Sequence, residues 1–343
     1  MHFDVMTRAD SWQNVATFAR DVERVGISGL LFTEAGQVPW MMIAAAAQAA
    51  PSLHHSTGIA VAFPRSPMIS AQIAWELASN TKGKFRLGLG SQVKPHIERR
   101  YGVKFEQPAK RMRDYMLAVK ASIQAFQGNE RLDHNGPFYK LNLLTPQWSP
   151  PRHDYENIKI DMSAVNPLML KVTGEVADGL HVHPMHSMPY IKNRVLPALK
   201  EGAQSAGRNL SDIDLIIPVL AVPGDSPEEQ ADMAKEAKTA IGFYGSTPVY
   251  AFQFDDLGYE GVRLKLAETL RSGGREALAA EVSDELLDQF GLVARWDDMA
   301  DKLIDRYNGI ASRVVMYLAK PSILKNPKNL EKWGEIARAV QAA

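Results

Sequence analysis

The strongest constraint on the fold of this chain is a regular alternation of short apolar runs with longer stretches of helical period. In residues 10–25, apolar side chains recur with the i, i+3, i+4, i+7 spacing of one buried helix face: Val15, Phe18, Ala19 and Val22. Strands that alternate with helices pair in parallel through crossover connections, and eight such units favour a closed (β/α)8 barrel, the TIM barrel. The eight expected strands are residues 2–6, 28–33, 57–62, 85–90, 158–163, 179–182, 213–222 and 313–318.

Two segments interrupt this alternation. Residues 128–156, after the fourth unit, contain four prolines and no helical period, and a small hairpin is expected at 137–143. Residues 243–296, after the seventh strand, begin with a stretch rich in Tyr, Ser, Thr and Pro. We interpret both as insertions in one barrel domain that spans residues 1–343. An open Rossmann sheet is the alternative, but Gly88-Leu89-Gly90 starts a G-x-G-x-x-G motif without its third glycine.

Charge and composition exclude several classes of protein. The 39 Lys and Arg balance the 39 Asp and Glu, so nothing favours non-specific binding of nucleic acid. The chain has no cysteine, which excludes disulfides, thiolate-bound metals and a thiol nucleophile. The longest apolar run, residues 40–47, is far shorter than the roughly 20 residues that span a bilayer, and no signal peptide is seen. We therefore expect a cytoplasmic protein that acts on a small molecule, without a nucleic-acid or membrane partner.

The active site of a (β/α)8 barrel lies at the C-terminal ends of its strands. Glu34 directly follows a buried strand and is a candidate acid or base, although a salt-bridged carboxylate is the alternative. Asn166-Pro167 opens a helix directly after a strand, where free backbone N–H groups can bind a phosphate. The candidates are Thr33, Glu34 and Trp40 after the second strand, Ser91, Gln92 and His96 after the fourth, and Ser163, Ala164, Val165 and Asn166 after the fifth.

Two histidines at the end of the sixth strand raise the question of a metal. His181 and His183 are two residues apart, so on a strand they point to one face, as in metal-dependent barrel hydrolases. A metal site needs further ligands at other strand ends, and the eighth strand offers Lys320 but no Asp. We therefore predict no metal site and assign His181 to a cofactor pocket, with the hydrolase as an alternative function. His54-His55 is expected to be solvated at the opposite end of the barrel.

Four stretches of the chain together carry a resemblance. They are Phe-Arg-Leu-Gly-Leu-Gly at 85–90, residues 93–102 from Val93 to Gly102, Gly-Glu-Val-Ala-Asp-Gly at 174–179, and Tyr-Gly-Ser-Thr-Pro at 244–248. With these stretches the chain resembles the luciferase-like flavin- and deazaflavin-dependent oxidoreductases, in particular their coenzyme F420-dependent subgroup. The resemblance implies a bacterial luciferase-like barrel, commonly a homodimer, that transfers a hydride between F420 and a small organic substrate. The alternative within the same fold is a two-component monooxygenase that uses reduced FMN and oxygen.

The resemblance also implies how the cofactor is held. The family's non-prolyl cis peptide on strand three would fall at Ala60–Val61, behind the cofactor ring. The family's phosphate loop maps to residues 163–166, in agreement with the helix-terminus argument. A basic rim of Lys94, Arg99, Arg100 and Arg65 suits an anionic cofactor tail. The other expected cofactor-binding residues are Thr33, Ser91, Gln92 and His181.

The resemblance is less complete for proton transfer. Glu34 matches the acidic residue at the ring edge in deazaflavin relatives, and Trp40 matches a nearby tryptophan. Where the sugar-phosphate-oxidising relatives have a glutamate, this chain has Val93, and where they have an asparagine beside it, this chain has His96. A glucose-6-phosphate dehydrogenase is therefore not expected, and Glu34 or His96 would have to transfer the proton.

Overall fold

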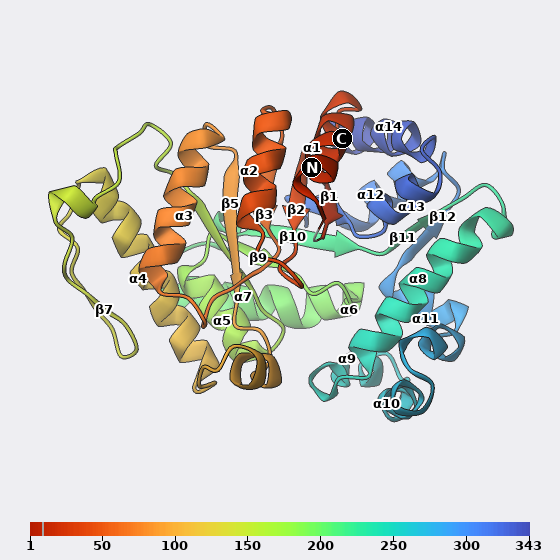
Figure 1. The fold of residues 1–343 in the computed structure, drawn as a ribbon. Coiled ribbons are helices and arrows are strands. Elements are labelled where there is room, and N and C mark those ends of the chain that lie inside the picture. The colour runs from red at the N-terminus through yellow and green to blue at the C-terminus, as the bar shows by residue number, and fades with distance from the viewer. Residues whose placement is uncertain (9) are drawn as a thin grey trace.

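The computed structural model describes residues 1–8 and 10–343, and its centre is a closed barrel of eight parallel strands (Figure 1). The strand order is β3-β2-β1-β13-β10-β9-β8-β5, and pairing of β3 with β5 closes the ring. The predicted TIM barrel is thus confirmed. The strands are β1 (His2–Thr7), β2 (Gly29–Phe32), β3 (His54–Thr57) with β4 (Ala60–Val61), β5 (Phe85–Gly90), β8 (Lys159–Ser163), β9 (Gly179–His181), β10 (Asp214–Val219) and β13 (Arg313–Met316).

Amphipathic helices surround the barrel. In α1 (Trp12–Arg24) the Ser11 hydroxyl accepts the Asn14 N–H as an N-cap, and the predicted apolar face is buried. The other helices near the barrel are α2 (Trp40–Ala49), α3 (Pro67–Asn80), α4 (Pro108–Gln127), α5 (Pro167–Val176), α6 (Met188–Tyr190), α7 (Leu196–Ser205), α12 (Met299–Tyr307), α13 (Ala319–Lys325) and α14 (Asn329–Ala342). A π-helical turn, Ile191–Val195, joins α6 to α7.

The first and last strands meet in the barrel wall. β1 pairs in parallel with β13, so that Asp4 lies opposite Val315. Arg313 donates to both oxygens of Asp4 at 2.6 and 2.8 Å, and this ion pair is buried. Two chain segments about 310 residues apart are thereby joined by a ladder and a bidentate charge pair.

The third barrel strand differs from its prediction in two ways. It begins at His54 rather than residue 57, and His55 is buried instead of solvated, which lowers its pKa to about 4. The cis peptide bond is Gly58–Ile59, so its expected position at Ala60–Val61 was wrong. Ala60 and Val61 instead pair with β5 as β4. Gly58 lies so close to Leu31 that a Cβ atom there would overlap its side chain.

Two glycines of β5 make room for side chains from neighbouring strands. Gly88 and Gly90 lie two apart, so they face the same side of the sheet. A Cβ atom at Gly88 would come within 2.5 Å of Nε2 of His181, and one at Gly90 within 2.5 Å of Oγ of Ser163. The glycines of this strand therefore allow His181 and Ser163 to project over it.

The segment 128–156 forms a hairpin at one end of the molecule (Figure 1). Its strands, β6 (His134–Asn135) and β7 (Lys140–Leu141), begin earlier than the expected 137–143. Asp114 of α4 holds the hairpin, because its Oδ2 accepts the N–H groups of Phe138 and Tyr139 and its Oδ1 lies 2.7 Å from Nε2 of His134.

The segment 243–296 is mostly helical and contributes Phe254, Leu266 and Leu278 to a second apolar cluster. The expected strand 213–222 is divided: β10 stays in the barrel, while β11 (Ala221–Pro223) leaves it to pair with β12 (Leu292–Ala294). This pairing ties the end of the insertion to the barrel. The helices here are α8 (Pro227–Gly245), α9 (Phe252–Asp255), α10 (Val262–Gly273) and α11 (Asp284–Phe290).

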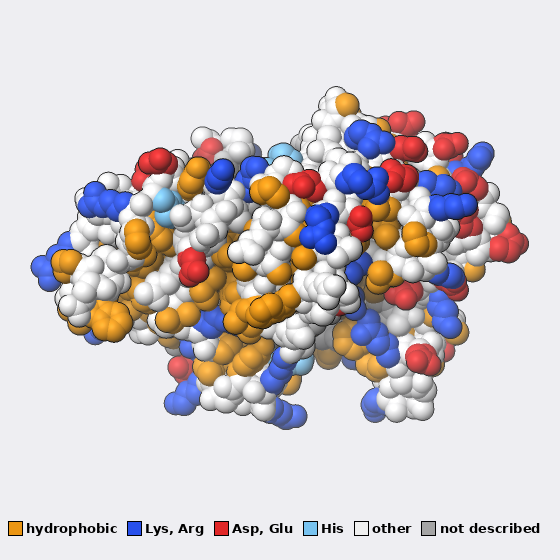
Figure 2. Space-filling model, turned by 45° about the horizontal axis from the view of Figure 1, so that its top comes forward, with side chains coloured by type: hydrophobic (Ala, Val, Ile, Leu, Met, Phe, Trp, Pro, Cys, Tyr) orange, Lys and Arg blue, Asp and Glu red, His pale blue; other side chains and the backbone are white. Residues whose placement is uncertain are grey.

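The surface mixes charges of both signs, as Figure 2 shows for one face. Within residues 1–8 and 10–343, no helix has the combined length and apolar character needed to cross a lipid bilayer.

Candidate functional site

A cavity of about 540 Å³ opens at the C-terminal ends of the barrel strands. Its volume falls in the range of roughly 300–1,000 Å³ that is usual for small-molecule sites. Most of the predicted site residues line it: Thr33, Glu34, Ser91, Gln92, Ser163, Ala164, Val165, Asn166 and His181. Trp40, His96, Ala60 and Val61 do not; Gly58 and Ile59 take the place of Ala60 and Val61 in the wall.

Glu34 is buried and is held in a bidentate ion pair. Its Oε1 accepts Arg65 Nη2 at 2.5 Å, and its Oε2 accepts Arg65 Nη1 at 2.8 Å and the Val61 N–H at 2.7 Å. Arg65 also donates to the Val61 carbonyl at 2.6 Å, and its guanidinium lies 5.6 Å from the centre of the Trp40 ring. Glu34 therefore joins the ends of β2 and β4, which is the salt-bridged alternative noted from the sequence. Its proton-transfer role stays a prediction.

His96 begins a short π-helix, His96–Arg100, and its side chain is exposed outside the cavity. The nearby Lys94 does line the cavity, and its only ion-pair partner among the described residues, Glu98, is 3.9 Å away. Arg100 donates to the Ala35 carbonyl at 2.5 Å. Of the predicted basic rim, Lys94 is thus the cation at the cavity wall.

The first turn of α5 has free backbone donors beside the cavity, namely the N–H groups of Leu168 and Met169, because Pro167 has none. Asn166 is the N-cap residue in an extended conformation, and its side chain makes no cap hydrogen bond. The first-turn N–H groups of a helix have no partner within the helix, so the start of α5 can bind an anion. The Tyr190 hydroxyl donates to the Val165 carbonyl at 2.8 Å and fixes the loop from the side of α6.

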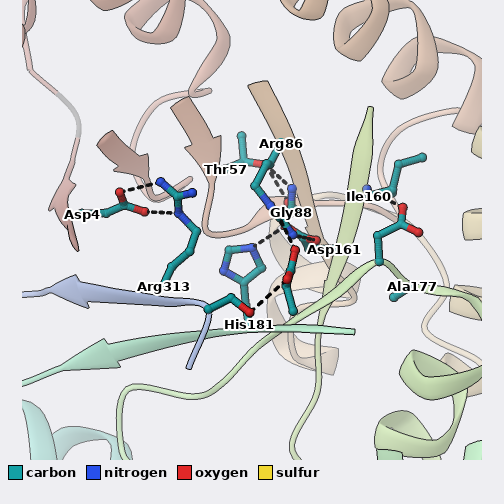
Figure 3. A network of polar contacts seen from close by, with 12 residues as sticks. Asp4, Thr57, Arg86, Gly88, Ile160, Asp161, Ala177, His181 and Arg313 are labelled. Carbon is teal, nitrogen blue, oxygen red and sulfur yellow. Dashed lines mark hydrogen bonds and ion pairs between the residues drawn. The ribbon is translucent and has the colours of Figure 1, made fainter. Parts of the chain in front are cut away.

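His181 lies beside a buried charge network (Figure 3), although its Nε2 makes no hydrogen bond among the described residues. Asp161 on β8 accepts Arg86 Nε at 2.9 Å and Nη2 at 2.7 Å, and Nε2 of His181 approaches Asp161 to 3.6 Å. Arg86 also donates to Asp214 at 2.8 Å. Burial would raise the pKa of Asp161, but the charge and hydrogen bonds of Arg86, with the contact from His181, outweigh it and lower that pKa.

His183 lines the same cavity as His181 but contacts different groups. The Met185 N–H donates to Nδ1 of His183 at 3.1 Å, and the imidazole packs 4.2 Å from the Tyr250 ring and 4.7 Å from the Tyr244 ring, measured between centroids. Within the described part of the chain, no three His, Cys, Asp or Glu side chains are grouped closely enough to hold a metal ion. The geometry therefore gives no support to a hydrolase that uses His181 and His183.

One wall of the cavity consists of residues that were not predicted as a group from the sequence. Tyr244, Tyr250 and Tyr317 line it together with His183, and we call these four residues the aromatic wall. Burial raises the pKa of Tyr250 to about 12, and it also raises the pKa of Tyr244 and of Tyr317. Tyr244 belongs to the stretch 244–248, whose only signal in the sequence is the family resemblance. No helical or strand period connects Tyr244 with Tyr250 or Tyr317, so the sequence did not indicate that they lie together.

Three observations fit a planar cofactor with a phosphate. Gly58 and Ile59 line the cavity without bulky polar side chains. Thr33 at the end of β2 also lines the cavity, and its hydroxyl is buried without a hydrogen-bond partner within 3.5 Å among the described residues. The free donors in the first turn of α5 border the same cavity, which Met169 lines. A ring and a phosphate can therefore be accommodated together.

Comparisons with known proteins agree with this geometry. The model of the luciferase-like monooxygenase family matches residues 1–313. An uncharacterised protein of Mycobacterium tuberculosis is 35% identical over 86% of each chain. The coenzyme F420-dependent tetrahydromethanopterin reductase of Methanopyrus kandleri shares the fold with a TM-score of 0.80 at 20% identity, over 97% of both chains. The oxygenating constituent of 3,6-diketocamphane monooxygenase of Pseudomonas putida, solved with FMN, has a TM-score of 0.67 at 16% identity, over 99% of this chain and 98% of that one.

Proposed function

Because this chain belongs to the luciferase-like monooxygenase family, we propose that it is an oxidoreductase that transfers a hydride between coenzyme F420 and a small organic substrate. The observation that carries the proposal is one cavity that combines free helix-terminus donors, Gly58 and Ile59 without bulky polar side chains, and Lys94 at its wall. A deazaflavin with a phosphate and an acidic tail needs all three. The F420-dependent reductase with the same fold supports this choice of cofactor.

The chain's own residues would bind and orient the cofactor. The N–H groups at the start of α5 would hold the phosphate, and Tyr190 keeps that loop in place through Val165. Gly58 and Ile59 would support one face of the ring, and Lys94 would neutralise a carboxylate of the tail. When bound, the deazaflavin supplies the hydride chemistry, and the protein supplies orientation and electrostatics.

Glu34 contributes in the first place by fixing the backbone behind the ring. Its oxygens are taken by Arg65 and by the Val61 N–H, so β4 is held against the end of β2. We propose that Glu34→Gln reduces turnover more than cofactor affinity, because the neutral amide cannot act as an acid or base, while the residues that would hold the phosphate and the tail are unchanged. If Glu34→Gln with cofactor bound turned over as fast as the unmodified protein, Glu34 would have no role in the reaction.

The alternative is an FMN-dependent two-component monooxygenase, which the FMN-bound structural neighbour represents. The two functions are separated by titrating the protein with F420 and with FMN and following cofactor fluorescence. We expect saturable binding of F420. Tight binding of FMN without binding of F420, together with oxygen consumption when a flavin reductase is added, would replace the proposal by the monooxygenase.

The phosphate site can be tested in the same titration. Leu168 is an exposed residue in the first turn of α5, so its replacement leaves the core intact. Leu168→Asp places a negative charge beside the proposed phosphate and should weaken F420 binding about tenfold, a cost of about 1.4 kcal/mol. Leu168→Asn has nearly the same shape without the charge and should bind as the unmodified protein does. Equal affinity of both variants would exclude a phosphate at this helix end.

The expected homodimer and the expected cytoplasmic location stay predictions.

A further inference from the structure

His181 turns one ring nitrogen toward a carboxylate and leaves the other open to the cavity (Figure 3). Its side chain is 7% exposed, and its Nε2 is enclosed at 3.6 Å from Oδ2 of Asp161, without a hydrogen-bond partner among the described residues. Nδ1 has no such partner either, yet it is not one of the enclosed polar atoms, so it faces the cavity that His181 lines. One nitrogen of this imidazole is therefore available to a ligand.

The strands place His181 near the proposed phosphate site. Ser163 and His181 are register partners on β8 and β9, so their side chains stand next to each other on the same face. Gly88 of β5 leaves the space that Nε2 occupies. Ser163 is also the first residue of the loop that leads to the free donors of α5. A cofactor whose phosphate binds at α5 would thus have His181 beside the start of its ring.

The charge network behind His181 has more negative than positive charge. Burial raises the pKa of Asp161, but the charge and hydrogen bonds of Arg86 lower it more, so this carboxylate is ionised at neutral pH. Arg86 also donates to Asp214, so one guanidinium serves two carboxylates. A proton on His181 would supply the second positive charge of this group.

The other charged side chains that line the cavity are already committed or exposed. Glu34 is held by both nitrogens of the Arg65 guanidinium. The side chain of Lys94 is 64% exposed, so solvent screens its charge. Neither group can change its charge inside the cavity as a buried imidazole beside a carboxylate can.

The aromatic wall contributes no group that changes its charge near pH 7. Burial lowers the pKa of His183 to about 4, so this imidazole is neutral. Burial raises the pKa of Tyr250 to about 12. It also raises the pKa of Tyr244 and of Tyr317, and the opposing charge of Arg8 does not outweigh it. His181 is therefore the group that could answer a change of charge in the cavity.

Hydride transfer to a bound deazaflavin adds one negative charge to the cavity, because a hydride carries two electrons with one proton. We propose that His181 balances this charge: it takes up a proton from the solvent, stays paired with Asp161, and donates Nδ1–H to the edge of the reduced ring. This inference rests on the proposed function, which supplies the cofactor. It adds a charge-balancing residue that makes the protein prefer the reduced over the oxidised cofactor.

The test compares the dissociation constants of oxidised and reduced F420 for the full-length protein. Fluorescence follows binding of the oxidised form, and anaerobic competition against it measures the reduced form. In His181→Asn the dissociation constant of reduced F420 should rise about tenfold, while that of oxidised F420 changes less than about twofold; a tenfold difference is about 30 mV for a two-electron couple. An equal change in both constants, or no change in either, overturns the proposal.

The pH dependence separates a charge from a neutral hydrogen bond. An imidazolium loses its proton as the pH rises, so the advantage of the unmodified protein over His181→Asn in binding reduced F420 should shrink between pH 6 and pH 10. The titration of the free cofactor cancels in this comparison, because both proteins meet the same cofactor at each pH. A constant advantage over the whole range would contradict the role of charge.

Two further variants exclude a merely structural effect. His181→Gln has a longer neutral side chain and should lose the preference for reduced F420 just as His181→Asn does. His183→Asn removes an imidazole that lines the same cavity but has no ion-pair partner among the described residues, and it should change both dissociation constants by the same factor. If the unmodified protein bound neither form of F420, the proposed function would fail. If it bound both and the His181 variants kept its preference, only the role of His181 would fail.

Discussion

Removing one charge from the network below the cavity should have a large effect on stability. Asp161 is completely buried and accepts two hydrogen bonds from Arg86. In Asp161→Asn one oxygen becomes an NH2 group that cannot accept from the guanidinium, so the Arg86 cation loses a buried partner. We therefore expect the free energy of unfolding to fall.

The size of the effect follows from what remains around each partner. Breaking a buried ion pair from one side typically costs about 3–5 kcal/mol. After Asp161→Asn, Arg86 still has Asp214 at 2.8 Å, a carboxylate one-third exposed, so the loss should lie near the lower end, about 3 kcal/mol. Arg86→Met leaves Asp161 buried without its main counter-charge and should cost more, about 4–5 kcal/mol.

Urea unfolding provides the measurement, followed by tryptophan fluorescence and by far-UV circular dichroism. The two signals should give the same midpoint and an unchanged m value, which shows that one transition is compared. The control is Arg24→Met, which removes a pair with Glu331 whose side chains are more than half exposed and should cost less than about 1 kcal/mol. If Asp161→Asn were no more destabilising than Arg24→Met, the buried network would not contribute as argued.

Three other outcomes can be checked directly. The pKa of Asp161 is lowered in the folded protein, so this carboxylate stabilises the fold fully above the unfolded carboxylate pKa of about 4, and the stabilisation is lost as the pH falls toward the folded pKa. Between pH 6 and pH 3 the urea midpoint should therefore fall less steeply for Asp161→Asn than for the unmodified protein. Gly58→Ala should lower cofactor affinity at least tenfold, since its methyl group meets a buried leucine, whereas Gly36→Ala, which has no atom within 4 Å of the new Cβ, should match the unmodified protein in the same fluorescence titration. Tyr190→Phe removes the bond to the Val165 carbonyl and should weaken F420 binding about fivefold, near 1 kcal/mol, with little change in the circular dichroism spectrum.

The barrel could be predicted from the sequence because its signals are local and repeated. Helix α1 illustrates this, since the period of Val15, Phe18, Ala19 and Val22 and the Ser11 cap both belong to one short segment. The division of residues 213–222 into two strands could not be predicted in this way. Both halves are apolar, and only pairing with residues 292–294, about 70 positions later, draws β11 out of the barrel.

The candidate site shows the same limit. Strand ends indicated Thr33, Ser91 and the loop 163–166, which all line the cavity. They could not indicate the partner of Glu34, because Arg65 lies 31 residues away and reaches it through the turn after β4. The aromatic wall was also hidden, since its members follow three different strands and converge only when the sheet closes.

The seam between β1 and β13 has a consequence for synthesis of the chain on the ribosome. Until residues 313–316 leave the exit tunnel, β1 and β10 each expose an edge without its neighbour, and Asp4 has no counter-charge. Unpaired strand edges favour association with other chains. The nascent protein therefore remains vulnerable to aggregation until β13 has been made, and a chain that ends before Arg313 has no means of closing the ring.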